Sequence, residues 1–405
     1  MRIHAATDND IFPPRFGGSQ RAFGLYRGLA HRHEVQALCV VPNRSRGAER
    51  ERAAGVELVR RRVWYTSLAW RLDQLGLAPL HLAARGHARE AARLMAALSG
   101  EAQVFAADLL LTGLFGSHPA KLKVYTAHNV EHDRFASTHP SMSRSQRWAA
   151  WVRDLEGRAV HGAGLTVACS AEDADRFVQL YGVARERVVV IPNGWDESRV
   201  HPTTLSRRAA ARAALGFGEA ETIALFVGSD VPHNREAARL LVDRLLPALA
   251  GQGVRLVVAG SVSRALSRSH DVALRVAGEV DDLEPWLHAA DVGINPVASG
   301  GGSNVKLPTY LAAGLAVITT AFGLRGYPEL APLVTVATPE AMAEALRERP
   351  RGWAARGLAM PAAVSALAWG NLGERLGERL AERLGERPGT EAPAHHAPQR
   401  REARA

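Results

Sequence analysis

Residues 300–306 read GGGSNVK, which combines bare backbone, small hydrogen-bonding side chains and a lysine. Glycines that open a helix let backbone N–H groups approach phosphate oxygens, and the helix N-terminus adds about half a positive charge. Lys306 would add a point charge one turn into that helix, and Ser303 would cap it. The expected anion-binding nest runs from Gly300 to Asn304 and includes Gly301, Gly302 and Ser303. The alternative is an ordinary capped helix whose lysine extends toward solvent.

The composition of the chain adds weight to Lys306. Only Lys121, Lys123 and Lys306 are lysines among the 50 basic residues. A position where any positive charge sufficed would therefore almost always hold arginine, so the lysine favours a functional role.

Two other glycine-containing stretches follow apolar runs of the sequence. RFGGS holds Gly17 and Gly18, and VGSDVPHN holds Gly228 and Ser229. Open parallel sheets bind ligands beyond the carboxyl ends of their strands, so these stretches predict two crevices that face each other. For Gly17 and Gly18 alone, a plain turn is an equal interpretation.

The stretch YTAHNVEHDRF (125–135) places His128 and Asn129 just past an apolar run. Polar groups at the end of a buried strand point into a crevice, so His128 is a candidate to contact a substrate hydroxyl or to neutralise developing charge. The alternative is a hydrogen-bonded loop histidine. A metal site is not favoured, because His128 and His132 would need a third ligand and none is evident.

Short apolar runs alternate with helical spacing along the whole chain, which predicts parallel sheets covered by helices on both faces. The runs include RIHAA, EVQALCVV, KVYTA and RVVVIP, and then TIALFVGS, VRLVVAGS, DVGINPV and LAVITT. The expected class is α/β with two doubly wound halves. The expected parts are a first domain at 1–197, a linker at 198–218, a second domain at 219–350, a helical segment at 351–387 and a disordered tail at 388–405.

Composition and charge exclude several classes of protein. The two cysteines, Cys39 and Cys169, lie in apolar runs and indicate buried reduced thiols in a cytoplasmic protein. The start of the chain shows no secretory signal, and Leu307–Leu324 is broken by proline and glycine, so it reads as a helix, a turn and a strand. The sequence contains no aromatic-rich basic repeat of the kind that binds nucleic acid. The basic stretch 43–62 reads better as a solvated loop and helix than as a contact with an anionic membrane surface.

The motifs taken in order resemble the glycosyltransferases of family 4, of the bacterial group 1 type. They include PPRFGGSQRA, AHNVEHDRF, VVVIPNGWD, FVGSDVPHNREA, GEVDDLEPWLHAADVGINP and GGGSNVKLPTYLAAGLAVITTAFGLRG. The resemblance runs from about residue 2 to about residue 370. It implies the GT-B fold, in which two Rossmann-like domains face each other across a cleft and a C-terminal helix, here about 352–385, crosses back to the first domain.

The resemblance also implies an activity. The second half would hold a nucleotide-diphosphate-sugar donor, the first half would hold a glycan or lipid-linked acceptor, and transfer would retain the anomeric configuration without a metal or cofactor. Gly17 and Gly18 would lie against the donor, and His128 would approach the sugar. Gly228 and Ser229 would line the phosphate pocket, the backbone of Glu279 and Val280 would meet the base, and Lys306 would face the diphosphate.

Several family residues are replaced in this chain. Two family glutamates that touch the sugar and the ribose fall at Gly301 and Thr309, and the phosphate-binding Arg and Lys fall at Ser229 and Asn234. Arg235 and Arg325 are possible substitutes for the lost charge. Two alternatives therefore stay open, namely a catalytically silent GT-B scaffold that binds a partner and, less favoured, a nucleotide-sugar epimerase on the same fold.

Overall fold

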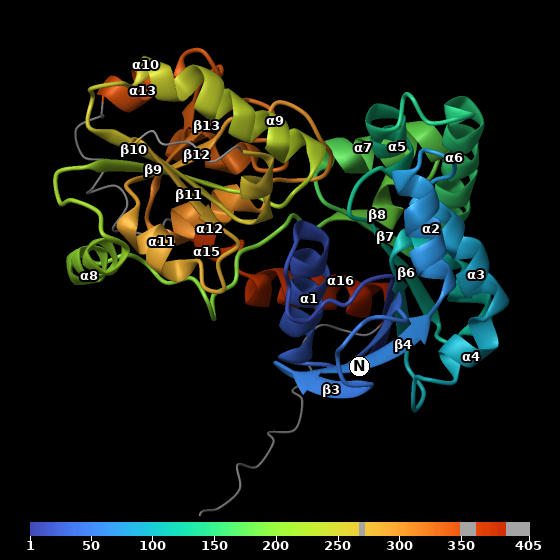
Figure 1. Cartoon of the computed structure of the whole chain (residues 1–405). Coiled ribbons are helices and arrows are strands. Elements are labelled where there is room, and N and C mark those ends of the chain that lie inside the picture. Colours follow the sequence, from blue (N-terminus) through green and yellow to red (C-terminus); the bar gives the residue numbers. More distant parts are fainter. Residues whose placement is uncertain (267–271, 349–361, 386–405) are drawn as a thin grey trace, which may run out of the picture.

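The computed structural model describes residues 1–266, 272–348 and 362–385. The chain forms two α/β halves, each built on its own sheet, and Figure 1 shows them side by side, with the crossing helix α16 and helix α1 at their junction. This arrangement confirms the predicted GT-B class of fold. The predicted disordered tail at 388–405 lies outside the described residues.

The first half is an eight-stranded sheet in the order β3-β4-β2-β1-β5-β6-β7-β8. All neighbours pair in parallel except β3 and β4. The strands are β1 (Arg2–Thr7), β2 (Glu34–Pro42), β3 (Arg50–Ala53), β4 (Val56–Val63), β5 (Val104–Ala107), β6 (Leu122–Thr126), β7 (Leu165–Ala168) and β8 (Val188–Val190). The chain leaves β1 toward β2 on one side and returns to β5 on the other, so the direction of winding changes between β1 and β5.

The helices of the first half cover both faces of its sheet. They are α1 (Gly17–Ala30), α2 (Tyr65–Gln74), α3 (Ala83–Arg89), α4 (Ala91–Met95), α5 (Glu131–Thr138), α6 (Ser145–Gly162) and α7 (Ala171–Tyr181). Helix α7 has a typical capping residue at each end. The Ser170 hydroxyl accepts from the Asp173 N–H, and Gly182 ends the helix with φ of 63°.

The basic stretch 43–62 is not the solvated loop and helix that we expected. It contains the antiparallel hairpin of β3 and β4, turned through Ala54 and Gly55 at φ of 45° and 86°. Arg60 is only 2% exposed, and its guanidinium bonds to Asp10 and to Glu51 at 2.8 Å each. The prediction was wrong because the stretch folds on itself as a hairpin. Glu49, Glu51 and Glu57 inside it pair with its arginines, and Asp10, outside it, also binds Arg60.

The second half is a six-stranded parallel sheet in the order β11-β10-β9-β12-β13-β14. Its strands are β9 (Thr222–Val227), β10 (Val254–Ala259), β11 (Leu274–Gly278), β12 (Val292–Asn295), β13 (Ala316–Thr319) and β14 (Thr335–Val336). Its helices are α8 (Leu205–Leu215), α9 (Pro232–Leu240), α10 (Leu246–Ala248), α11 (Glu284–Ala289), α12 (Lys306–Ala313) and α13 (Met342–Glu348). The direction of winding changes between β9 and β12.

Two stretches of this half show how local sequence becomes structure. The expected linker 198–218 contains α8, which packs on α11. The stretch 307–324 is a helix, a turn at Gly314 (φ 86°) and a strand, as predicted. Across the described parts of the chain, the structure has no helix with the length and apolar character needed to cross a membrane.

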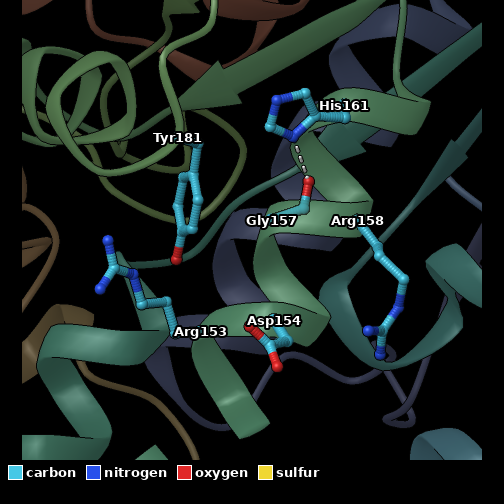
Figure 2. Close-up of a pocket in the computed structure, with 6 residues that line it drawn as sticks. All are labelled: Arg153, Asp154, Gly157, Arg158, His161 and Tyr181. Atoms are coloured by element: carbon cyan, nitrogen blue, oxygen red, sulfur yellow. Dashed lines mark hydrogen bonds between the residues drawn. The ribbon is translucent and has the colours of Figure 1, made fainter. Parts of the chain in front are cut away.

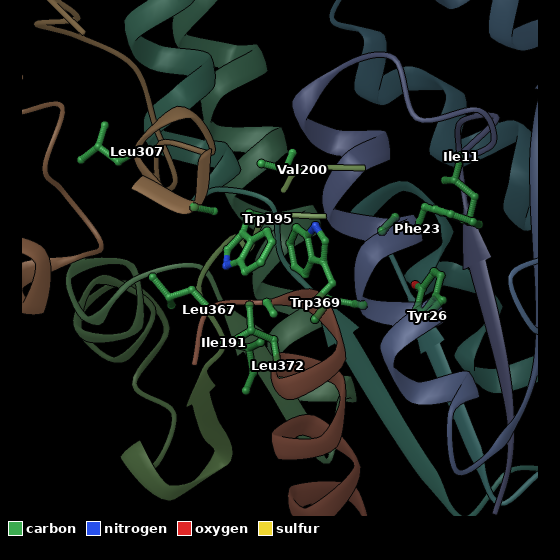
Figure 3. Packing of buried hydrophobic residues seen from close by; sticks show 14 of the residues in the cluster. Ile11, Phe23, Tyr26, Ile191, Trp195, Val200, Leu307, Leu367, Trp369 and Leu372 are labelled. Atoms are coloured by element: carbon green, nitrogen blue, oxygen red, sulfur yellow. The ribbon is translucent and has the colours of Figure 1, made fainter. Parts of the chain in front are cut away.

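The C-terminal segment returns to the first half, as predicted, but its described part is two helices and not the single helix over about 352–385 that we expected. After α15 (Ala362–Ser365), the backbone N–H groups of Trp195 and Trp369 pair with the carbonyls of Leu367 and Trp195 at 3.1 Å each. Helix α16 (Trp369–Leu384) then packs along α1. Figure 3 shows Trp195 and Trp369 together in this core between the halves.

Candidate active site

A cavity of about 1200 Å³ lies between the two halves and is lined by both. It collects the loops that follow the carboxyl ends of the central strands, which is where open parallel sheets bind ligands. Figure 2 shows a separate, smaller cavity of about 370 Å³ between α6 and α7, lined by Arg153, Asp154, Gly157, Arg158, His161 and Tyr181. The cavity between the halves is the candidate site because it is the larger of the two and gathers the loops at the strand ends.

The second half contributes the predicted nest after β12. Gly300 and Gly302 have φ of 127° and 66°, a conformation that favours glycine, and Gly301, Ser303 and Asn304 line the cavity beside them. Helix α12 begins at Lys306, however, and not at residue 303. The predicted cap at Ser303 is wrong: its hydroxyl accepts the Asn193 N–H at 3.1 Å, and its carbonyl accepts from Asn193 Nδ2 at 2.9 Å.

Lys306 lies beside this nest and forms a hydrogen bond with Asn234. The Lys306 Nζ donates to Asn234 Oδ1 at 2.9 Å and lies 5.3 Å from the centre of the Phe226 ring. Within the described residues, no carboxylate forms an ion pair with this ammonium. Burial lowers the pKa of Lys306 to about 7. An anion that entered the cavity would therefore supply the missing negative charge.

This lowered pKa predicts a pH dependence. Between about pH 7 and pH 10.4, the unfolded chain keeps the lysine proton while the folded chain has lost it, so stability should rise with pH across that window. Binding of a diphosphate in the cavity should weaken as pH rises above 7, because the ammonium is lost. We expect calorimetric titrations with a nucleoside diphosphate from pH 6 to pH 9 to show affinity falling with pH in wild-type protein and not in Lys306→Met. An equal slope in the variant would exclude Lys306 as its source.

His128 faces the same cavity from the first half. Its Nε2 lies 3.3 Å from Asp108 Oδ1, and Thr126 Oγ1 donates to the same oxygen at 3.0 Å. Burial lowers the pKa of His128, but the Asp108 carboxylate more than offsets this, and the net direction is upward. The site thus presents a readily protonated imidazole opposite the nest.

The two halves touch where the His128 loop meets the nest. A Cβ on Gly301 would lie 2.8 Å from Asn129 Oδ1, and one on Gly302 would lie 2.7 Å from the carbonyl oxygen of His128. A larger side chain at either position would push the halves apart in this conformation. This contact accounts for glycine at the place that the family resemblance assigns to a glutamate.

Most of the remaining predicted residues line the cavity. Gly17 and Gly18 at the start of α1, Gly228 and Ser229 after β9, and the Glu279–Val280 segment all line the cavity. Thr309 also lines it, although its hydroxyl donates to the Val305 carbonyl at 2.9 Å. The Glu279 side chain pairs with Arg264 at 2.8 Å on the surface, so only its backbone suits the predicted contact.

Neither arginine that we expected to replace the lost phosphate contacts is free to do so. Arg235 does not line the cavity, and its Nε donates to Asp230 at 2.5 Å. Arg325 does line the cavity, but its Nη2 donates to the buried Asp173 of α7 at 2.5 Å, across the junction between the halves. Of the three basic residues that we expected at the phosphate, Lys306 is the one that forms no ion pair with a described carboxylate.

Several cavity residues escaped the sequence analysis, among them Asp8, Asp108 and His233. Asp8 and Asp108 directly follow β1 and β5, the two strands between which the winding of the first sheet changes direction. Burial and then repulsion by Asp108 raise the pKa of Asp8 to about 7. A charged residue just after each of two central strands was the signal that could have found them. His233 of α9 also lines the cavity, and burial lowers its pKa to about 4.

Two Rossmann-like halves around a shared cavity, joined by a returning helix, define the GT-B class of protein. Two family profiles match the chain: one described as Glycosyltransferase Family 4 over residues 17–199, and one described as Glycosyl transferases group 1 over residues 221–349. The chain belongs to these family 4, group 1 glycosyltransferases.

Curated relatives match only part of the chain. The D-inositol 3-phosphate glycosyltransferase of Nocardia farcinica is 35% identical over 128 residues, which is 31% of this chain and 27% of the relative. The protein of the same name from Geodermatophilus obscurus is 30% identical over 187 residues, or 42% of this chain and 40% of the relative. The matched regions therefore span less than half of these relatives.

Solved structures match over nearly the whole chain. Sucrose-phosphate synthase from Thermosynechococcus elongatus has a TM-score of 0.68 at 15% identity, covering 95% of this chain and 100% of that chain. HepE of Anabaena, in complex with UDP and glucose, has a TM-score of 0.62 at 16% identity, covering 93% and 99%. WaaG, a glycosyltransferase involved in lipopolysaccharide biosynthesis, has a TM-score of 0.62 at 19% identity, covering 94% and 99%. These similarities support the fold.

Proposed function

We propose that this protein transfers a sugar from a nucleotide-diphosphate-sugar donor to an acceptor, with retention of anomeric configuration and without a metal. The observation that carries the proposal is the buried ammonium of Lys306, which lacks a carboxylate partner among the described residues and lies at a glycine nest opposite His128. A diphosphate leaving group needs such fixed positive charge and N–H donors where its negative charge develops.

The two halves would have separate roles in this reaction. The nest and Lys306 would hold the diphosphate, and the Glu279–Val280 backbone would meet the base. His128 would stabilise charge at the sugar, because its proton is favoured by Asp108. The enzyme would supply placement and electrostatics, as no covalent intermediate is required of these groups. Retention and independence of metal rest on the family resemblance.

The acceptor would enter from the first half. We propose a glycan or a lipid-linked glycan in cell-surface polysaccharide assembly, handled in the cytoplasm or at the inner face of the membrane. The curated relatives are named for D-inositol 3-phosphate, so that phosphorylated polyol is the first small acceptor to test.

Donor hydrolysis without acceptor is the direct test. Purified protein incubated with a panel of nucleotide sugars should slowly release a nucleoside diphosphate, and D-inositol 3-phosphate or a glycan acceptor should accelerate that release. Absence of binding and of release with every donor would favour the silent scaffold, which the loss of several family residues supports. A changed sugar without diphosphate release would favour an epimerase.

Contact with an anionic membrane is better placed on α2 than on the basic stretch 43–62. Large apolar side chains are exposed by 47% or more on and beside α2: Trp64 just before the helix, Leu68 and Trp70 on it, and Leu75 and Leu77 after it. Exposed tryptophans and leucines on a surface helix are typical of helices that lie in a membrane interface. Arg71 on the same helix forms no ion pair with any described residue and would face anionic headgroups.

We expect the double variant Trp64→Ser/Trp70→Ser to lose binding to vesicles of phosphatidylglycerol and phosphatidylcholine. Each exposed tryptophan would contribute apolar area on insertion, so cosedimentation should fall by about tenfold or more. Leu205→Ser, at a residue 72% exposed on α8 of the other half, is the matched control and should bind like wild type. Unchanged binding by the double variant would rule out α2 as the contact.

A further inference from the structure

Glu156 of α6 is a fully buried carboxylate whose two oxygens each accept two hydrogen bonds. Oε1 accepts from the Glu131 N–H at 2.8 Å and from the Tyr125 hydroxyl at 3.1 Å. Oε2 accepts from the His132 N–H at 3.1 Å and from the Tyr181 hydroxyl at 2.7 Å. Glu156 does not line the cavity between the halves, so the proposed reaction gives it no direct role.

These contacts cap a helix that has no cap of its own. Helix α5 begins at Glu131, and the preceding residue, Val130, has no side chain that could accept the first N–H groups. Such N–H groups need an acceptor, and a negative charge beside them is favourable. Glu156 meets both needs from a different helix, and Figure 1 shows α5 and α6 together at the same end of the first half.

The cap connects to the cavity through the side chain of Glu131. Its Oε1 accepts from Asn129 Nδ2 at 3.1 Å, and its Oε2 lies 3.1 Å from His81 Nε2. Because the Asn129 amide nitrogen is directed to Glu131, the amide oxygen Oδ1 is directed to Gly301 of the other half. Residues 128–130, which include His128, thus lie between a fixed helix start and the end of β6.

We propose that Glu156 is a positioning residue of this site, which caps α5 from α6 and thereby holds His128 and Asn129 against the glycine nest of the second half. Its effect on catalysis rests on the proposed function. Its effect on the loop does not, and the two can be measured separately.

Two conservative variants separate this role from plain stability. In Glu156→Gln, one oxygen becomes an NH₂ group, and each oxygen of Glu156 faces one backbone N–H. Either orientation of the glutamine therefore leaves the N–H of Glu131 or of His132 without an acceptor. Tyr181→Phe removes the 2.7 Å bond to the same carboxylate but keeps both backbone bonds. It is the matched control.

The measurements should be made at pH 8, because burial raises the pKa of Glu156 to about 7. In Glu156→Gln we expect amide hydrogen exchange at residues 131 and 132 to be about tenfold faster or more, and the pKa of His128, followed by NMR, to fall as its loop moves away from Asp108. We expect donor turnover to fall by about tenfold or more, because small displacements of reacting groups are costly. UDP affinity, which depends on the second half, should stay unchanged. Tyr181→Phe should leave all four quantities near wild type.

Each outcome decides between the interpretations. Unchanged exchange in Glu156→Gln would overturn the cap, and faster exchange with an unchanged His128 pKa would overturn the positioning of the site. Equal losses of donor turnover in Glu156→Gln and Tyr181→Phe would mean that Glu156 only stabilises the fold. If wild-type protein turns over no donor, the proposed function fails. Amide exchange and the pKa of His128 still decide whether Glu156 caps α5 and positions His128. Should Glu156→Gln not fold, Glu156→Asp, which keeps the charge but is one methylene shorter, gives the same comparison.

Discussion

Lys306→Met is expected to lose donor turnover and to bind UDP roughly 10- to 150-fold more weakly than wild type, since one charge-assisted hydrogen bond to phosphate contributes about 1.5–3 kcal/mol. Methionine keeps an unbranched apolar side chain and removes the ammonium, which lies 5.3 Å from the centre of the Phe226 ring. Because a buried charge without an ion-pair partner is costly, the variant should melt at the same temperature as wild type or higher. Calorimetric titration of UDP and thermal unfolding would measure both effects.

Arg235→Ala is the control for this prediction. Arg235 also lies on the second half, after β9, but Asp230 holds its guanidinium and the side chain does not line the cavity. Its removal should change UDP affinity by less than about threefold. If Lys306→Met bound UDP like wild type, or if Arg235→Ala weakened binding equally, the diphosphate would have to lie elsewhere in the cavity.

The sequence predicted the parts of the site that local chemistry determines. Parallel strands buried on both faces read as continuous apolar runs, so the strand ends and the loops after them could be located. The nest at 300–304 followed from its glycines, and Lys306 stood out because the chain otherwise uses arginine. Of the candidate site residues that the sequence predicted, all except Arg235 line the cavity in the structure.

The remaining parts depend on partners that are distant in sequence. Asn234 carries no signal of its own, yet its amide oxygen holds Lys306, which lies 72 residues away. Ser303 looks like a helix cap, but its partner is Asn193 in the other half, 110 residues earlier. Arg325 looked free to bind phosphate until the structure paired it with Asp173. Such pairings arise from packing within the second half or between the two halves, and a local pattern does not contain them.

The crossing of α16 over α1 gives the second large prediction, since the backbones of these helices are in contact. A Cβ on Gly28 would lie 2.2 Å from the Trp369 carbonyl oxygen, and one on Gly373 would lie 2.3 Å from the Gly28 carbonyl carbon. Gly28→Val should therefore force the helices apart and cost about 3 kcal/mol or more of unfolding free energy. Denaturant unfolding followed by circular dichroism would measure the loss.

Gly116→Val provides the matched control, because nothing lies within 4 Å of a Cβ at that exposed position. It should unfold within about 0.5 kcal/mol of wild type. Helix α1 begins with Gly17 and Gly18 in the cavity, and Trp369 of α16 also lines the cavity. Below its melting temperature, Gly28→Val should therefore lose transfer activity while its second half still binds UDP. Unfolding free energies that match between the two variants would show that the backbone contact does not hold the crossing helix in place.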